Sequence, residues 1–177
     1  SSKNSKPTLT ILHQNTQEVS NEINRLIHLI ETLTPPPNIV ILTEHGLKRY
    51  QIESAHIIPG YCLISHFSRE HYRKGGVAIF IEEKLEGCSE LVNISQHCEE
   101  FVCEMAMIKL KINKTCLSVM GIYRSPDRGI DEALESMSRA IEDTNGENSP
   151  LIIMGDINVD ILKPDRKSVK LNEMLAS

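Results

Sequence analysis

The stretch Leu151–Asp160, Leu-Ile-Ile-Met-Gly-Asp-Ile-Asn-Val-Asp, joins a short apolar run to a polar end. An apolar run without polar interruption predicts a buried strand, and Gly155 allows the backbone to turn after it. Asp156 and Asn158 would then project from the carboxyl end of that strand. A carboxylate there can hold a divalent cation or orient a water, and an amide can donate to a phosphate oxygen. A plain strand followed by a polar turn explains this stretch equally well, so the other strands have to decide.

Three further apolar runs predict buried strands, and each is followed by polar residues. The runs and the residues that follow them are Leu9–His13 with Asn15, Asn38–Leu42 with Glu44, and Thr115–Ile122 with Tyr123 and Arg124. Open α/β sheets bind their ligands at the carboxyl ends of their strands, so we expect these side chains to lie near Asp156. Together they suit one hydrated Mg²⁺ and one phosphate.

Six short motifs follow one another along the chain. They are Leu-His-Gln-Asn (12–15), Ile-Leu-Thr-Glu (41–44), Ile-Pro-Gly-Tyr (58–61), Arg-Lys-Gly-Gly-Val-Ala-Ile-Phe (73–80), Gly-Ile-Tyr-Arg-Ser-Pro (121–126) and Ile-Met-Gly-Asp-Ile-Asn (153–158). In this order they resemble the endonuclease/exonuclease/phosphatase superfamily, and most closely its branch in non-LTR retrotransposons, where the domain nicks target DNA. The resemblance extends from about Leu9 to Leu162. It implies a two-sheet α/β sandwich with outer helices and an active site at one end.

The resemblance also implies a role for each strand-end residue. Glu44 matches the metal-binding Glu of the family, and we expect it to hold Mg²⁺ or Mn²⁺ weakly. Asp156 matches the Asp that orients or activates the attacking water, and Tyr123 matches a Tyr that approaches the scissile phosphate. Asn158 matches the phosphate-binding Asn, and Asn15 matches the Asn that contacts phosphate or metal-bound water.

Basic residues near these motifs are candidate DNA contacts. Arg124 stands where the retrotransposon branch often carries an Arg, which would contact DNA. Lys48 follows the second predicted strand, and Arg73 and Lys74 precede a Gly-Gly turn. A solvated loop of mixed charge explains that last pair equally well. The net charge of −5 argues weakly against tight DNA binding, because Lys and Arg supply most of the affinity, but it does not exclude it.

The chain departs from the family pattern after Asp160. Members of the family continue to a further Asp and then to a Ser-Asp-His block, whose Asp binds metal and whose His pairs with the phosphate or the water-orienting Asp. No His follows His97 in this sequence. We therefore expect a disordered segment at 1–7 and a single, C-terminally truncated domain at 8–177. Its second half would be incomplete, with little beyond the 151–154 strand and a helix after Lys163.

Two classes of function remain open. One is a Mg²⁺-dependent endonuclease of a mobile element, of which this chain would be a portion with little or no activity. The other is a catalytically inactive, retrotransposon-derived module for binding or assembly. An incomplete half would expose an apolar face and a strand edge, so we also expect a homodimer that covers them. A phosphatase acting on small molecules shares the fold, but the motifs at 73–80 and 121–126 favour it less.

Composition excludes other broad classes. With 40% apolar and 24% charged residues among 177, the chain is an ordinary globular protein. No apolar run reaches the length needed to span a bilayer, and no signal-peptide pattern is seen, which favours an intracellular protein, nuclear or cytoplasmic. The five cysteines are odd in number and lack a Cys-x-x-Cys pair, so reduced thiols are expected rather than disulfides or zinc ligands.

Hydrophobic periodicity predicts the remaining elements. Apolar residues three and four apart predict amphipathic helices at Val19–Leu33 and from Ile130 onward, and a third helix from near Asp165. Further strands are expected at Tyr61–His66, Gly76–Ile81 and Phe101–Leu110. Glu104 is the one polar residue inside the last of these strands.

Overall fold

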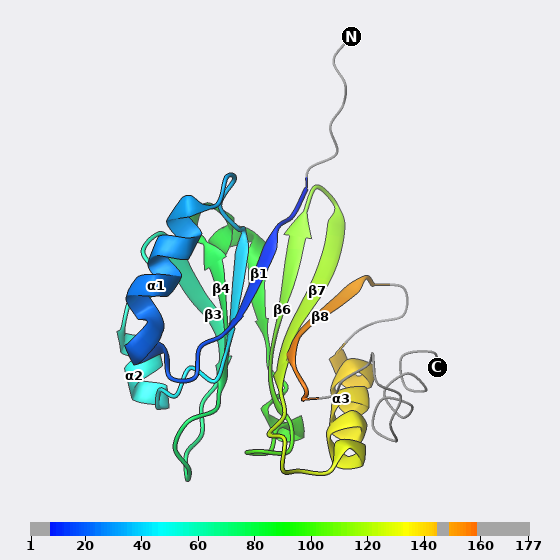
Figure 1. The fold of residues 1–177 in the computed structure, drawn as a ribbon. Coiled ribbons are helices and arrows are strands. Elements are labelled where there is room, and N and C mark those ends of the chain that lie inside the picture. Colours follow the sequence, from blue (N-terminus) through cyan, green and yellow to red (C-terminus); the bar gives the residue numbers. More distant parts are fainter. Residues whose placement is uncertain (1–7, 145–148, 159–177) are drawn as a thin grey trace.

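Two four-stranded sheets form the centre of the protein in a computed structural model, which describes residues 8–144 and 149–158 (Figure 1). Sheet A has the order β1-β2-β4-β3, with the bounds β1 Ile11–Asn15, β2 Ile39–Thr43, β3 Tyr61–Phe67 and β4 Val77–Glu82. Sheet B has the order β5-β6-β7-β8, with the bounds β5 Ser89–Val92, β6 Glu104–Ile112, β7 Thr115–Tyr123 and β8 Leu151–Asp156.

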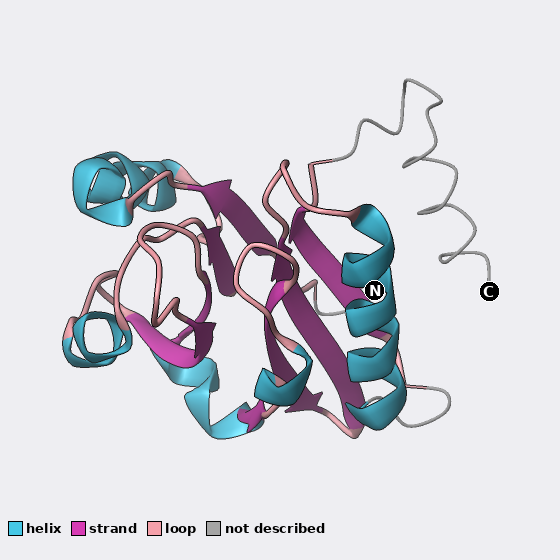
Figure 2. Cartoon of the chain, turned by 90° about the horizontal axis from the view of Figure 1, so that it is seen from below, coloured by secondary structure: helices cyan, strands magenta, loops and turns pink. Residues whose placement is uncertain are grey.

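The helices lie on the outer sides of the two sheets, with the strands between them (Figures 1 and 2). Their bounds are α1 Val19–Thr32, α2 Arg49–Ser54 and α3 Ile130–Thr144, with short 3₁₀ helices η1 Glu83–Cys88 and η2 Ser95–His97. Leu26 and Ile30 of α1 pack against sheet A, and Leu134 and Met137 of α3 pack against sheet B. This is the predicted two-sheet α/β sandwich with outer helices.

Strand β2 is buried on both faces, which explains its uninterrupted apolar sequence. Ile39 and Ile41 face the layer between the sheets, whereas Val40 and Leu42 face the layer under α1. The sheets approach closely at Gly121 of β7, where an added Cβ would lie 2.8 Å from a methyl of Val77 and 2.9 Å from one of Ile41. A side chain at position 121 would therefore push the sheets apart.

Each sheet contains one parallel pair of neighbouring strands. β1 runs parallel to β2 in sheet A, and β7 runs parallel to β8 in sheet B. All of these strands run toward the lower end of the sandwich in Figure 1, so their carboxyl ends meet there. The predicted functional residues lie at those ends.

Several expectations need correction or fall outside the described part. Sheet B has four strands, so the second half holds more than the 151–154 strand. The first strand runs from Ile11 to Asn15 rather than from Leu9 to His13, which makes Asn15 its last residue. The segment 1–7 and the helix expected from near Asp165 lie outside the described residues. None of the described helices is long and apolar enough to cross a membrane.

Candidate active site

Two hydrogen bonds join the sheets at the carboxyl ends of their parallel strands. Tyr123, the last residue of β7, donates its hydroxyl to the carboxylate of Glu44, which directly follows β2. Asn15, the last residue of β1, donates from Nδ2 to Oδ2 of Asp156 at 3.3 Å, and Asp156 ends β8. Each bond takes one partner from each sheet. Four residues that follow separate apolar runs in the sequence are thus brought together.

The strand register explains why these four residues converge. In sheet A, Asn15 lies opposite Thr43, so Glu44 follows at the same level. In sheet B, Tyr123 lies directly opposite Asp156. Adjacent residues of parallel strands lie about 4.8 Å apart, and the two hydrogen bonds close the remaining sides. The site is therefore a ring of side chains across the seam between the sheets.

Glu44 has a fixed and unusual backbone. Its φ of 54° lies in the left-handed region, which residues with a side chain seldom adopt. Its N–H donates to the carbonyl of Gly76 at 2.8 Å, and its carbonyl accepts from the N–H of Glu18 at 2.8 Å and the hydroxyl of Thr16 at 3.0 Å. These bonds on three sides hold the conformation and aim the carboxylate at Tyr123.

Tyr123 is a proton donor in this arrangement. Burial raises the pKa of its hydroxyl well above 10, and the hydrogen bond to the Glu44 carboxylate raises it further. The phenol therefore stays protonated at neutral pH and fixes one side of the Glu44 carboxylate.

The Asp156 carboxylate is held on both oxygens. Oδ2 accepts from Asn15, and Oδ1 accepts from the backbone N–H of Asn158 at 2.9 Å. Asn158 itself adopts a φ of 53°, and its Nδ2 donates to the carbonyl of Arg124. The turn from Asp156 to Asn158 is thus tied to the end of β7.

Arg124 is fully buried, and its guanidinium serves the backbone. It donates to the carbonyls of Ile157 at 2.8 Å and Asn158 at 3.0 Å on one side, and to those of Ser125 and Arg128 on the other. Burial lowers the pKa of Arg124 from its usual value, while the nearby Asp156 acts in the opposite direction. The expected DNA contact through Arg124 is therefore wrong in this structure, because no part of the side chain reaches solvent.

The other predicted DNA contacts divide into two kinds. Lys48 donates from Nζ to the carbonyls of Arg69 at 2.9 Å, Glu70 at 3.3 Å and Tyr72 at 2.8 Å, and so caps the loop between β3 and β4. Three carbonyls occupy all three donors of its ammonium group. This use differs from the phosphate contact that the sequence predicts for Lys48. Arg73 and Lys74 are exposed on the same loop.

A buried ion pair beside the site escaped the sequence argument. Glu104 is fully buried and pairs with Arg69 at 2.7 Å. Its carboxylate also accepts from the N–H groups of Gly76 at 2.6 Å and Phe101 at 2.8 Å. The Arg69 guanidinium lies 6.0 Å from the centre of the Tyr123 ring. The available signal was the single acid within an apolar strand, but its partner is 35 residues away in the sequence.

The donor set at the seam suits a hard divalent cation. Glu44 and Asp156 supply carboxylate oxygens, and neither forms an ion pair with a described residue. Mg²⁺ and Mn²⁺ prefer such oxygen ligands and retain several waters. Within residues 8–144 and 149–158, no group of three or more His, Cys, Asp or Glu side chains is placed to hold a metal. The described residues therefore fit a weakly held, largely hydrated ion at Glu44.

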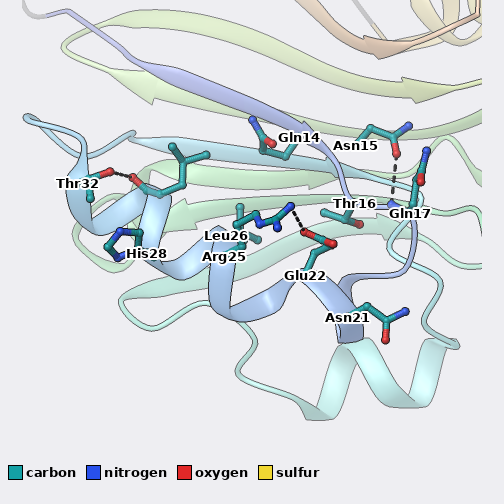
Figure 3. A pocket seen from close by; sticks show the side chains of 11 residues that line it. Gln14, Asn15, Thr16, Gln17, Asn21, Glu22, Arg25, Leu26, His28 and Thr32 are labelled. Atoms are coloured by element: carbon teal, nitrogen blue, oxygen red, sulfur yellow. Dashed lines mark hydrogen bonds and ion pairs between the residues drawn. The ribbon is translucent and has the colours of Figure 1, made fainter.

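A cavity of about 620 Å³ lies beside this site rather than at it. It runs between β1 and α1, with Asn15 at one end and Thr32 at the other (Figure 3). Among the predicted site residues only Asn15 lines it, and the Oδ1 of Asn15 is taken by the N–H of Gln17 at 3.3 Å. We therefore place the chemistry at the strand ends.

Solved structures with the same architecture identify the fold. An endonuclease/exonuclease/phosphatase family protein from Bacteroides thetaiotaomicron is similar with a TM-score of 0.65 and 17% identity, over 95% of this chain and 70% of that one. The chain has the endonuclease/exonuclease/phosphatase fold. The endonuclease domain of TRAS1, a telomere-specific non-LTR retrotransposon, shares this fold with a TM-score of 0.68 and 16% identity, over 96% and 72% of the two chains.

A DNA-bound structure of the same fold gives a third comparison. The 3′ phosphatase NExo from Neisseria, bound to a product DNA hairpin, has a TM-score of 0.68 at 13% identity, over 96% of this chain and 71% of that one. No family model matches the sequence, and no curated protein matches it. At these identities the likeness concerns the endonuclease/exonuclease/phosphatase fold alone.

Proposed function

We propose that the seam site belongs to a metal-dependent phosphodiesterase that cleaves DNA in the manner of a retrotransposon endonuclease. The observation that carries the proposal is the pair of cross-sheet contacts, Glu44 with Tyr123 and Asn15 with Asp156. They bring two carboxylates and two hydrogen-bonding groups to one point at the sheet ends. The similarity to the TRAS1 endonuclease domain and to DNA-bound NExo supports DNA as the substrate.

Asp156 is the residue that orients the attacking water. Its two oxygens are positioned by the amide of Asn15 and the backbone N–H of Asn158. Each carboxylate oxygen can accept more than one hydrogen bond, so lone pairs remain for a water O–H. A water held in this way attacks phosphorus in line with the leaving oxygen.

Glu44 is the residue that would hold Mg²⁺ or Mn²⁺. The Tyr123 hydroxyl binds one oxygen of its carboxylate and leaves the other oxygen for the ion. A bound divalent cation supplies charge stabilisation at a phosphoryl oxygen. With so few protein carboxylates in reach, binding is weak.

Asn158 and two exposed cations bind the substrate phosphates in this proposal. An amide nitrogen carries two hydrogens, and one of those on Asn158 bonds the Arg124 carbonyl, which leaves one for a phosphate oxygen. Arg73 and Lys74 are exposed on the β3–β4 loop and supply the positive charge that DNA binding needs.

Metal titration tests the assignment of Glu44. We expect weak Mn²⁺ binding that Glu44→Gln removes and that Glu90→Gln leaves unchanged, because Glu90 is an exposed acid on β5, away from the seam. An unchanged binding curve in Glu44→Gln would sink the assignment.

Plasmid cleavage tests the reaction. With the protein in excess over supercoiled DNA, slow Mn²⁺-dependent relaxation that Asp156→Ala abolishes would support the proposal. Metal binding without any cleavage under these conditions would favour a catalytically inactive module for binding or assembly.

We also propose that the protein forms a homodimer through the edge of sheet B. β8 is the end strand of that sheet, and Leu151–Met154 are only partly buried in the described part of the chain. A second copy would cover this edge and the apolar side chains beside it. Light scattering at tens of micromolar should give twice the chain mass, and a monomer mass would contradict the dimer. Leu171, Met174 and Leu175, also expected at this interface, lie outside the described residues.

A further inference from the structure

Three loops at the site end of the sandwich bring two aromatic rings together with two arginines. The rings of Tyr72 and Phe101 meet edge to face, with centres 4.8 Å apart and planes at 72°. The guanidinium of Arg69 lies 4.0 Å from the centre of the Phe101 ring, and that of Arg128 lies 5.4 Å from it. We call these four residues the rim cluster.

The rim cluster adjoins the seam site. Arg69 also faces the Tyr123 ring at 6.0 Å, and Tyr123 binds Glu44. The backbone carbonyl of Phe101 accepts from the N–H of Ser125 at 2.8 Å, two residues beyond Tyr123. The β3–β4 loop that carries Tyr72 projects from the lower end of the sandwich in Figure 1, where the functional strands also end.

Buried contacts hold the rim cluster in place. Glu104 binds Arg69 and the N–H of Phe101, and Phe101 keeps a φ of 70°, which bulky residues seldom adopt. The N–H groups of His71 and Tyr72 donate to Glu100 at 3.1 and 3.4 Å. A surface that is already ordered loses little conformational entropy when a ligand binds.

Packing within the protein explains Phe101 but leaves Tyr72 unexplained. Phe101 is partly buried between two guanidinium groups and a ring edge, whereas Tyr72 is 54% exposed. An exposed aromatic ring, held at its edge, presents a face for stacking. Nucleic-acid bases stack on such rings, and the arrangement needs cations nearby for the phosphates.

The charges around Tyr72 suit a DNA strand. Arg73 and Lys74 follow it on the same loop, and Arg128 approaches from the loop after β7, all three exposed. The acids close by are Glu70, which is exposed, and Glu100, which is engaged by two backbone N–H groups. A duplex held by its phosphates alone would not need the exposed ring.

We propose that Tyr72, supported by Phe101, stacks on an unpaired base next to the scissile phosphate, while Arg73, Lys74 and Arg128 bind the flanking phosphates. The inference rests on the proposed function and deepens it, because it names the substrate class. DNA with a bulged or unpaired base beside the cleavage point binds more tightly than a perfectly paired duplex.

Binding in EDTA tests this inference without any cleavage. The probes are a duplex with one bulged 2-aminopurine and the same duplex fully paired. Tyr72→Ala weakens binding of the bulged duplex about 5- to 100-fold, abolishes quenching of the 2-aminopurine, and hardly changes the paired duplex. Tyr72→Phe keeps the ring and binds within about twofold of the parent protein.

Tyr50→Ala is the matched control. Tyr50 is 72% exposed on α2 and lies outside the rim cluster, so its removal leaves both affinities unchanged. Thermal melting checks that the variants fold. Equal effects of Tyr72→Ala and Tyr50→Ala, or equal losses on bulged and paired DNA, would overturn the inference.

The outcomes separate this inference from the proposed function. Plasmid cleavage that needs Asp156 but bulge binding that ignores Tyr72 leaves the phosphodiesterase and overturns the stacking surface. Tyr72-dependent bulge binding in a protein that never cleaves DNA keeps the stacking surface and overturns the phosphodiesterase.

Discussion

Arg124 acts on the active-site turn from within the protein. Its planar guanidinium reaches backbone carbonyls on both sides, including those of Ile157 and Asn158. A lysine carries a point charge and cannot reproduce this fork, so Arg124→Lys leaves buried carbonyls without a donor. We expect a loss of about 3 kcal/mol in the free energy of unfolding, measured by urea denaturation. Hydrogen exchange should be faster at the amide of Asn158.

The same substitution on the surface provides the control for Arg124. The side chain of Arg139 on α3 is 64% exposed and pairs only with Glu135 one turn away. Arg139→Lys should change stability by less than about 0.5 kcal/mol. Equal effects at the two positions would mean that the Arg124 carbonyl contacts contribute little.

His45 makes stability depend on pH. It is fully buried, its Nε2 bonds the Phe67 carbonyl at 2.9 Å, and its Nδ1 accepts from the N–H of Leu47 at 3.0 Å. Burial lowers its pKa to about 4. Its contribution to stability is therefore complete above pH 6.5 and is lost as the pH falls from 6.5 to 4, because the unfolded chain takes up the proton first. The loss amounts to about 3 kcal/mol.

His45→Gln isolates this effect, since an amide can replace both hydrogen bonds without titrating. Denaturation in EDTA at several pH values should show a gap between the two proteins that is constant above pH 6.5 and changes by about 3 kcal/mol toward pH 4. Parallel curves over the whole range would show that His45 is not the group responsible.

At the scale of elements, the Arg69–Glu104 ion pair ties the β3–β4 loop to β6. Arg69→Met or Glu104→Met alone leaves a buried charge without its partner, which costs about 3–5 kcal/mol. We expect the double variant to be less destabilised than the sum of the two, as measured in a double-mutant cycle by urea denaturation. Purely additive losses would mean that the pair does not act as a unit.

The exposed pair of Arg49 and Glu53 on α2 gives the comparison for this cycle. It has a similar separation of 3.1 Å, but its side chains are 76% and 48% exposed. Its coupling should be about 0.3–0.5 kcal/mol, because solvent screens it.

Burial decides how far these elements could be predicted from the sequence. β2 was predicted because both of its faces are buried, and α1 because its apolar residues repeat at helical spacing. β5 was missed because Glu90 and Leu91 are exposed and break any alternation. α2 is too short to show a period.

The site shows the same division between local and distant information. The strand-end residues follow from apolar runs, because parallel strands place their ends at one edge. The burial of Arg124 and the partner of Glu104 depend on segments far apart in the chain, and no local pattern encodes them.

At the scale of the whole molecule, the candidate site exists only when the two sheets pack. Each cross-sheet contact takes one residue from sheet A and one from sheet B. The close approach at Gly121 sets the spacing between the sheets near this seam. Any change that separates the sheets should therefore weaken metal binding at Glu44 before it unfolds either sheet.

The last prediction concerns the activity of the 177-residue chain tested alone. The family resemblance implies two further groups, a metal-binding Asp and a His, and no His follows His97 in this sequence. Loss of one group that stabilises the transition state costs about 10²–10³ in rate. We therefore expect Mg²⁺-dependent relaxation of supercoiled plasmid to be slower than that by the TRAS1 endonuclease domain by on the order of 10² or more.

Asp156→Ala sets the background for that assay, since it removes the residue proposed to orient the water. A rate close to that of the TRAS1 endonuclease domain, abolished by Asp156→Ala, would contradict the prediction. It would mean that the four residues at the seam, together with the bound ion, suffice for cleavage. A rate at the background instead agrees with a site whose remaining groups hold metal and DNA without completing the reaction.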